Sequence, residues 1–322
     1  MNIGIIGCGN IGCKRAESIE KDDVILGCAD IDLEKASKFQ RQYNISFSSS
    51  NYKDILKITS IDVVFVCTSN NMLREIAVNA IASGKHVLIE KPGGENARDI
   101  ITIISETTRC LKKVCVGYNH RYHPAILQAK QIINSNGLGE LMFCRGLYGH
   151  GGRVGMENEW RAKVGELSDQ GSHLIDLAGW FIGNNWTEVQ GKAIDLFWEN
   201  YHDDNAFLIL TNDKHKTAFL HASCTEWRNM FQFEIYGNMG KLRIDGLGNS
   251  YGIEKLTYYD MRKRKELPEI VSWEFPEKDN SWNLEWINFK KSIMADEEPS
   301  SSLYNALNIM TVVEKINKTS KT

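Results

Sequence analysis

Closely spaced cysteines, which zinc sites and redox motifs require, are absent from this 322-residue sequence. Its eight cysteines are scattered, no C-x-x-C pair occurs, and most stand in apolar contexts such as FVCTS and KVCVGY. We therefore expect reduced, small buried side chains rather than disulfides or zinc ligands. His120, His123 and His150 show no metal-ligand spacing either, so no metal is implied.

Long hydrophobic runs and an excess of one charge are also lacking. No apolar stretch reaches the ~20 residues of a membrane span, and the opening MNIGIIGCGN meets glycines too early for a signal peptide. The formal net charge of -3 provides no global basic field for nucleic acid or an anionic membrane. We expect a cytoplasmic protein that binds neither.

What is present is the composition of a globular protein, with 42% hydrophobic and 25% charged residues and enough length for about two domains. In the first third, short apolar runs alternate with segments of helical period at residues 32–43 and 72–83. The runs are residues 3–6, 24–29, 63–67, 86–89 and 114–117. Strands without period-two alternation are buried on both faces, so residues 1–119 are predicted to form a doubly wound α/β Rossmann domain with a parallel sheet.

The first predicted strand ends in GCGNIG, which gives Gly7, Gly9 and Gly12 the G-x-G-x-x-G spacing before a helix. Such glycines permit a tight turn, close approach of a pyrophosphate and close helix packing. Asp30 ends the second strand, about 20 residues on, where a carboxylate binds ribose hydroxyls. Ile31 follows rather than an Arg suited to a phosphate, which favours NAD over NADP. Alternatively, Asp30 only caps the next helix.

Beyond residue 119 the pattern of residues changes, and all eight tryptophans occur there. FQFEIYG and KLRID flank NMG as in a hairpin, and AFLIL and TAFLHAS flank TNDKHK in the same way. Helices are expected around residues 283–294 and 303–318. Residues 120–322 are therefore predicted to form an α+β domain whose mainly antiparallel sheet has helices on one face.

The stretch LIEKPGG places Lys91 just beyond the predicted strand 86–89. Ligands bind beyond the carboxyl ends of parallel strands, and an ammonium group there can hydrogen-bond a hydroxyl and stabilise a developing alkoxide. The alternative is a solvated surface Lys paired with Glu90.

A second group of chemical residues lies in DQGSHLIDLAGW. Asp169, His173 and Asp176 are spaced i, i+4 and i+7, so a helix brings them to one face. An imidazole with an ordinary pKa of about 6.5 suits a base that takes the proton of an alcohol near neutral pH. Asp176 orients the imidazole or serves structure, and a lone His on such a helix is more often a core or surface residue.

With GCGNIG, CADIDLEKA, CTSNN, GKHVLIEKP, VGYNHRYHP and DQGSHLID in this order, the chain resembles the Gfo/Idh/MocA family over nearly its whole length. The resemblance implies that Lys91 lies over the nicotinamide and that the Lys91–Pro92 peptide is cis. It also implies that Asp169 and His173 bind sugar hydroxyls and assist proton transfer. We expect His173 to be the base, Lys91 to polarise the hydroxyl and Asp169 to position it, although Lys91 and His173 can exchange roles.

The resemblance and the motifs together define the expected contacts. Cofactor contacts are Gly7, Gly9, Asn10, Ile11, Gly12, Asp30, Thr68, Asn70, Glu90 and Lys91. Substrate contacts are Lys91, Asn119, Arg121, Arg161, Asp169 and His173. Arg121 has the alternative of an ion pair at the domain junction.

These expectations describe an NAD-dependent oxidoreductase that transfers hydride between nicotinamide and a secondary hydroxyl of a sugar, sugar derivative (including nucleotide sugars) or cyclitol. The alternatives are an NAD-dependent glycosidase acting through transient oxidation and a non-catalytic nucleotide-sensing regulator. By analogy with the family, the exposed sheet face pairs subunits into homodimers or homotetramers. The family's glycine run before the D-x-x-x-H segment is reduced to Gly165 in RAKVGELSDQG, which leaves the substrate open.

Overall fold

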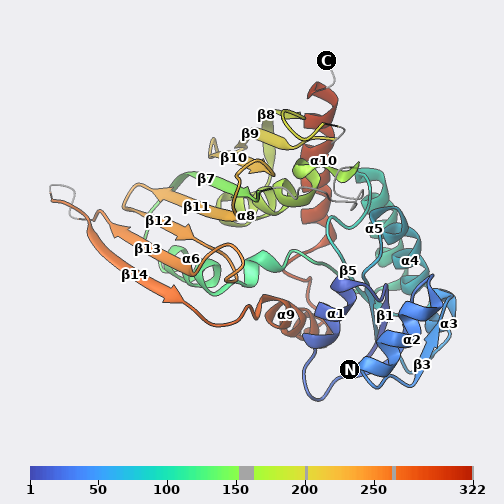
Figure 1. Ribbon diagram of the computed structural model, residues 1–322. Coiled ribbons are helices and arrows are strands. Elements are labelled where there is room, and N and C mark those ends of the chain that lie inside the picture. The colour runs from blue at the N-terminus through green and yellow to red at the C-terminus, as the bar shows by residue number, and fades with distance from the viewer. Residues whose placement is uncertain (152–162, 200–201, 263–265, 321–322) are drawn as a thin grey trace. The chain divides into compact units, whose positions relative to one another are not determined.

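The computed structural model describes residues 1–151, 163–199, 202–262 and 266–320. The chain folds into two compact units (Figure 1). The first comprises Met1–Asn119 with Trp282–Leu307, and the second comprises His120–Ser281 with Asn308–Thr322. No helix in the described ranges is both long enough and apolar enough to cross a membrane.

The first unit contains a parallel six-stranded sheet of order β3-β2-β1-β4-β5-β6 within the described residues. Its strands are β1 (Asn2–Ile6), β2 (Val24–Ala29), β3 (Phe47–Ser49), β4 (Val63–Val66), β5 (His86–Ile89) and β6 (Val114–Val116). Strand β4 is buried along its whole length, because helices cover both faces of such a sheet. The strand order is that of the doubly wound nucleotide-binding fold, which confirms the predicted Rossmann domain.

Helices connect these strands: α1 (Asn10–Glu17), α2 (Leu33–Gln42), α3 (Tyr52–Leu56), α4 (Asn70–Ala82) and α5 (Ala97–Cys110). The side chain of Asp32 caps α2 by accepting the N–H groups of Glu34 and Lys35. Helix α1 instead begins after Gly9 with no capping side chain, so its first N–H groups are not satisfied by a cap.

The segment Trp282–Leu307 packs with the first unit, although the sequence assigns it to the second domain of residues 120–322. It carries most of α9 (Ser281–Ala295). Trp286 is fully buried against Phe65, with ring centroids 5.0 Å apart, and its indole N–H donates to Asp23 over 2.7 Å. This burial of a large aromatic ring explains why the segment returns to the Rossmann core.

The second unit is built on a sheet of eight strands within the described residues, in the order β14-β13-β12-β11-β7-β10-β9-β8. These are β7 (Leu141–Gly149), β8 (Trp186–Ile194), β9 (Asn205–Asn212), β10 (Thr217–Ser223), β11 (Met230–Gly237), β12 (Gly240–Asp245), β13 (Glu254–Asp260) and β14 (Glu269–Phe275). Only the β7–β10 pairing among these strands is parallel. The predicted hairpins are confirmed as β9–β10 and β11–β12.

Helices α6 (Pro124–Asn134) and α8 (Ser172–Ile182) pack on one face of this sheet, against β13 and β7 (Figure 1). The remaining elements are the short helices η1 (Asn119–Tyr122) and η2 (Leu167–Gly171), and α10 (Leu303–Ser320), which is shared by the two units. On the opposite face, Phe207, Ile209 and Phe219 are 39%, 44% and 45% exposed, while Leu208 and Leu220 face the core.

Candidate active site

The glycine turn after β1 has the geometry of a dinucleotide site. Gly7 has a φ of +99°, and a Cβ there would lie 2.3 Å from the carbonyl oxygen of Cys67. A Cβ at Gly12 would lie 2.1 Å from the carbonyl oxygen of Gly7. A Cβ at Gly9, by contrast, would meet no atom of the described residues within 4 Å. The turn therefore packs tightly on both sides and leaves open space at the N-terminus of α1, which fits a pyrophosphate.

Asp30 stands beside this turn at the end of β2. Its Oδ2 accepts the N–H of Cys8 over 2.9 Å, and its Oδ1 accepts the N–H of Asp32 over 3.0 Å. The cap of α2 is Asp32, so capping does not account for Asp30. A carboxylate held next to the pyrophosphate turn fits the ribose hydroxyls of the cofactor.

Thr68 follows β4, the strand next to β1, and its backbone N lies 3.1 Å from the position of a Cβ on Gly7. Its hydroxyl oxygen is buried without a hydrogen-bond partner among the described residues. A buried polar atom in this state fits a ligand that supplies the missing bond. Asn70 begins α4, and Asn10 and Ile11 lie in the first turn of α1. Because these helices follow β4 and β1, all three candidates lie beyond the carboxyl ends of parallel strands.

At the end of β5, the carboxylate of Glu90 is bound by Arg15, a fully buried residue of α1 that the sequence did not single out. Arg15 Nη2 lies 2.6 Å from Glu90 Oε1. Burial opposes the charge of Arg15, but Glu90 and Glu285 hold its pKa above the ordinary value. Lys91 comes next, partly exposed, and the Lys91–Pro92 peptide is cis, as the resemblance implies.

In the second unit, Asp169 and His173 lie on one continuous helical stretch, but its first turn is not the regular helix that their spacing predicts. Asp169 lies in η2, a π-helical turn, and His173 and Asp176 lie in α8. Asp169 is 8% exposed and His173 is 7% exposed. A π-helical turn is wider than an α-helical one and is common at functional sites.

The start of η2 depends on the one glycine that remains of the family's glycine run. Gly165 has a φ of +78°, and a Cβ there would lie 2.0 Å from Asp203 Oδ1. The N–H of Leu167 donates to Asp203 Oδ2 over 2.8 Å, and the N–H of Glu166 donates to the Asp203 carbonyl over 3.1 Å. The buried Asp203 thus fixes the turn that precedes Asp169.

The described contacts of Asp176 are with Arg121 and not with an imidazole. Arg121 Nε donates to Asp176 Oδ2 over 2.8 Å, and a second, shorter bond joins Nη2 to Oδ1. Both side chains are buried, and burial raises the pKa of Asp176 while Arg121 opposes the rise. The pair fastens α8 to η1.

His120, the residue before Arg121, lies against the candidate base His173. The rings of His120 and His173 stack with centroids 3.7 Å apart and planes 25° apart. His120 Nε2 lies 3.1 Å from the hydroxyl oxygen of Tyr148 on β7. The motifs of the sequence do not single out His120 or Tyr148 as active-site residues; the signal that could have pointed to His120 is its position inside NHRYHP, next to Arg121.

The remaining predicted residues are divided between the units. Lys91 and Asn119 belong to the first unit, and Asp169 and His173 to the second. Arg161 lies outside the described residues. Within the described residues, no cluster of three or more His, Cys, Asp or Glu side chains could hold a metal ion.

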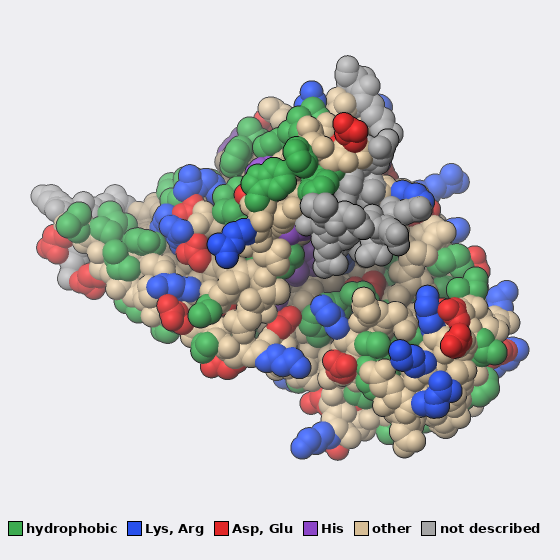
Figure 2. Space-filling view, viewed as in Figure 1, with side chains coloured by type: hydrophobic (Ala, Val, Ile, Leu, Met, Phe, Trp, Pro, Cys, Tyr) green, Lys and Arg blue, Asp and Glu red, His purple; other side chains and the backbone are tan. Residues whose placement is uncertain are grey.

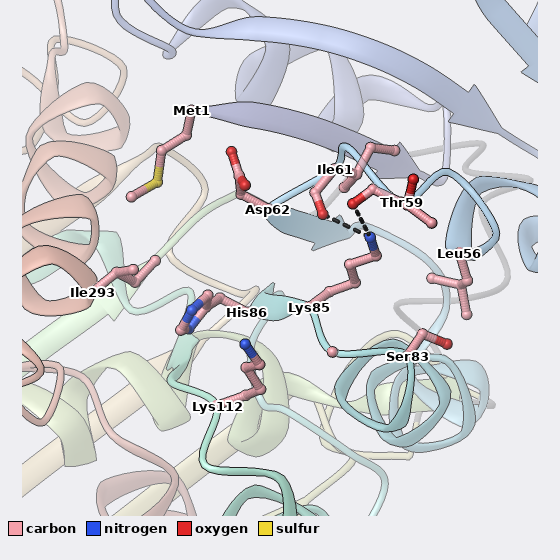
Figure 3. Close-up of a pocket in the computed structure, with 11 residues that line it drawn as sticks. Met1, Leu56, Thr59, Ile61, Asp62, Ser83, Lys85, His86, Lys112 and Ile293 are labelled. Carbon is pink, nitrogen blue, oxygen red and sulfur yellow. Dashed lines mark hydrogen bonds between the residues drawn. The ribbon is translucent and has the colours of Figure 1, made fainter.

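A separate pocket of about 510 Å³ opens at the amino-terminal ends of β4 and β5, away from the glycine turn (Figure 3). Lys85 Nζ donates there to the carbonyl oxygens of Ile61 and Thr59, over 2.7 and 3.2 Å. Burial, helped by Lys112, lowers the pKa of His86 to about 4. The lysine's contacts are structural, and parallel sheets bind ligands at the opposite strand ends.

The site geometry agrees with comparisons to known families. Residues 1–118 match a family model described as an oxidoreductase family with an NAD-binding Rossmann fold. Residues 126–243 match the GFO/IDH/MocA C-terminal domain. The chain belongs to the GFO/IDH/MocA family. It is an oxidoreductase of that family, and its first unit is an NAD-binding domain.

Several members of the GFO/IDH/MocA family are similar to this chain. Myo-inositol 2-dehydrogenase of Thermotoga maritima is 23% identical over 257 residues, which cover 77% of this chain and 76% of the relative. Levoglucosan dehydrogenase of Pseudarthrobacter phenanthrenivorans is 27% identical over 208 residues, which cover 57% of this chain and 51% of the relative. A solved levoglucosan dehydrogenase in complex with NADH shares the fold, with a TM-score of 0.89 and 19% identity over 100% of this chain and 97% of that one.

Proposed function

We propose that this family member is an NAD-dependent dehydrogenase that oxidises a secondary hydroxyl of a sugar, a sugar derivative or a cyclitol. The observation that carries the proposal is the buried pair of Asp169 and His173 on one helical stretch, in a chain whose other unit binds NAD. A non-catalytic protein that only binds a nucleotide has no need of a buried acid and imidazole of this kind. The inositol and levoglucosan dehydrogenases among its relatives support the substrate class.

NAD, when bound, supplies the hydride acceptor. The open space over Gly9, the carboxylate of Asp30 and the buried hydroxyl of Thr68 would hold it. His173 takes the proton of the substrate hydroxyl, since a neutral imidazole is basic enough near pH 7. Asp169 holds a neighbouring hydroxyl in place. Lys91 polarises the reacting oxygen, although Lys91 and His173 can exchange these two roles.

The preference for NAD over NADP rests on Asp30. Its carboxylate lies at the ribose end of the glycine turn and would repel the additional phosphate of NADP. Ile31, the next residue, is 94% exposed and offers no positive charge to that phosphate.

Association through the sheet is part of the proposal. Hydrophobic side chains gather over the region of β9 and β10 (Figure 2). Phe207, Ile209 and Phe219 on the open face expose enough apolar surface to favour a second copy, as in a homodimer or homotetramer. Light scattering after gel filtration measures the mass directly, and a monomer at micromolar concentration contradicts this part.

The test of function is a substrate panel. The appearance of NADH is followed by absorbance with inositols, aldoses, uronates and nucleotide-linked sugars, each with NAD and with NADP. We expect NADH formation with at least one polyol or sugar. NAD binding without turnover of any compound would overturn the proposal in favour of a nucleotide sensor, and release of a sugar from a glycoside without net NADH would replace it by the glycosidase route.

A further inference from the structure

The candidate base His173 does not stand alone in its unit. Its ring lies face to face with the ring of His120, at a centroid distance of 3.7 Å and an interplanar angle of 25°. Both side chains are buried, at 7% exposure each. At this separation, in a site with little water, a proton on one imidazole strongly disfavours a proton on the other. The two rings therefore titrate as one coupled pair.

His120 is itself held from the other side. Its Nε2 lies 3.1 Å from the hydroxyl oxygen of Tyr148, whose ring lies 5.0 Å from that of Tyr251. Burial raises the pKa of Tyr148 well above its ordinary value, and a hydrogen bond with Tyr251 and the charge of Asp169 add to the rise. Tyr148 therefore remains a neutral phenol whose oxygen can accept an N–H from His120.

Other charged and titratable groups of the second unit surround the pair. His123 is 5.5 Å from His120 between ring centroids, and its Nδ1 lies 3.0 Å from Glu254. The groups contributed by neighbouring elements are Arg121 on η1, Tyr148 on β7, Glu166 before η2, Asp169 on η2, Asp176 on α8, Tyr251 before β13 and Glu254 on β13. Arg121 and Asp176 neutralise each other, and Asp169 and Glu166 favour one positive charge near the rings. The carboxylates thus favour binding of one excess proton by the histidine pair. The close stacking of the two rings disfavours a second, because two positive charges would then lie face to face.

We propose that His120 is a positioning residue that keeps His173 unprotonated: the stacked pair carries a single excess proton, and that proton resides on His120, whose Nε2–H donates a hydrogen bond to the hydroxyl oxygen of Tyr148. This inference rests on the proposed role of His173 as the base. It gives His173 the neutral form that proton abstraction requires, even when the pH falls below the value at which a lone imidazole beside Asp169 becomes charged. It also fixes the plane of the base, because a stacked ring cannot swing freely.

The experiment is an NMR titration of the histidine rings in the full-length protein, with and without substitutions. His120→Phe keeps a flat stacking ring but carries no proton, and Tyr148→Phe keeps its ring but loses the oxygen that accepts from His120. His215→Asn is the matched control, since His215 is exposed on the β9–β10 turn with a φ of +57° that Asn also tolerates. Thermal unfolding verifies that each variant is folded, and His120→Gln replaces His120→Phe if the latter does not fold.

In the unmodified protein we expect His173 to titrate below the ordinary histidine value of about 6.5. Loss of the charged neighbour removes the repulsion, so the pKa of His173 should rise by about one unit or more in His120→Phe and by less in Tyr148→Phe. His215→Asn should leave it unchanged. Where turnover is measurable, the acid limb of kcat/KM should move to higher pH in the same order, because the base is lost at higher pH.

An unchanged titration of His173 in folded His120→Phe would overturn the inference, because a purely structural stack does not alter protonation. The titration needs no turnover, so it remains decisive if the substrate panel fails. A shift of His173 without any dehydrogenase activity would retain the coupled pair while removing the proposed function. Activity with an unmoved acid limb and an unmoved titration would retain the function while removing the role of His120.

Discussion

The two units of the molecule build their sites in different ways. The nucleotide site of the first unit is largely a backbone shape, in which Gly7 and Gly12 allow close packing and Gly9 leaves open space. The second unit builds its site from side chains that come from separate elements, such as His120, Tyr148 and His173. One half of this enzyme is therefore specified by short-range spacing in the sequence and the other by tertiary packing.

The two units thus have different tasks, turnover and nucleotide binding, and substitutions can affect one without the other. Changes to the side chains of the second unit should alter turnover and leave nucleotide binding intact. Changes to the glycine turn should do the reverse. A substitution in one unit that changes both turnover and NAD affinity would contradict this separation.

The largest effect is expected from removing His173, the proposed base. His173→Asn should lower kcat by about 10²- to 10⁴-fold, the usual contribution of general acid–base catalysis. The Kd for NAD, measured by calorimetry, should change by less than about threefold, since His173 belongs to the other unit. A comparable loss of NAD affinity would show that the two tasks are not separate.

The ion pair between Arg121 and Asp176 tests how far the second unit depends on paired side chains. Arg121→Met leaves a buried carboxylate without its partner and should lower the free energy of unfolding by about 3–5 kcal/mol. Arg121→Met combined with Asp176→Leu should recover most of this loss in denaturant titrations. We expect the KM of the double variant to stay within about threefold, and a much larger KM would instead assign Arg121 to the substrate.

The glycine turn should respond to a single methyl group. Gly9→Ala should leave the thermal midpoint unchanged, because the new Cβ meets no described atom within 4 Å. It should weaken NAD by about 30-fold or more, which corresponds to ~2 kcal/mol, because the methyl occupies the space of the pyrophosphate. Gly7→Ala is the contrast: its Cβ would lie 2.3 Å from a carbonyl oxygen, so the midpoint itself should fall. Equal midpoints for the two variants would contradict the shape of the turn.

The smallest effect is expected at the ribose end of the cofactor. Asp30→Ala should weaken NAD about tenfold, as for the loss of a hydrogen bond to a charged group, and should weaken NADP less. Asp32→Ala removes the cap of α2 only two residues away and is the matched control, with NAD affinity unchanged. Parallel losses for NAD and NADP in Asp30→Ala would remove the basis for the cofactor preference.

The same contrast explains what could be predicted from the sequence. The parallel sheet, the glycine turn and Asp30 follow from apolar runs and residue spacing, because neighbours in the chain are neighbours in the fold. The two hairpins follow for the same reason. Asp169 and His173 can be proposed as site residues because they stand close together in the sequence, within a motif that resembles the family's.

The rest depended on contacts that spacing cannot show. His120 meets Tyr148 across 28 positions of sequence, and Arg15 meets Glu90 across 75. Trp286 packs into the first unit and binds Asp23 across 263 positions of sequence. The π-helical turn at Asp169 was missed because it depends on Asp203, a buried residue more than thirty positions further along the chain.

The proposed function, made from the motifs of the sequence, assigns Lys91 and His173 to the same substrate hydroxyl. A double-mutant cycle on kcat/KM with Lys91→Ala, His173→Ala and the combined variant tests it most directly. Residues that act on the same hydroxyl have strongly non-additive effects, so we predict that the combined variant is hardly slower than the slower single variant. Losses that simply multiply would rule out a shared hydroxyl, because they are expected of residues that work independently.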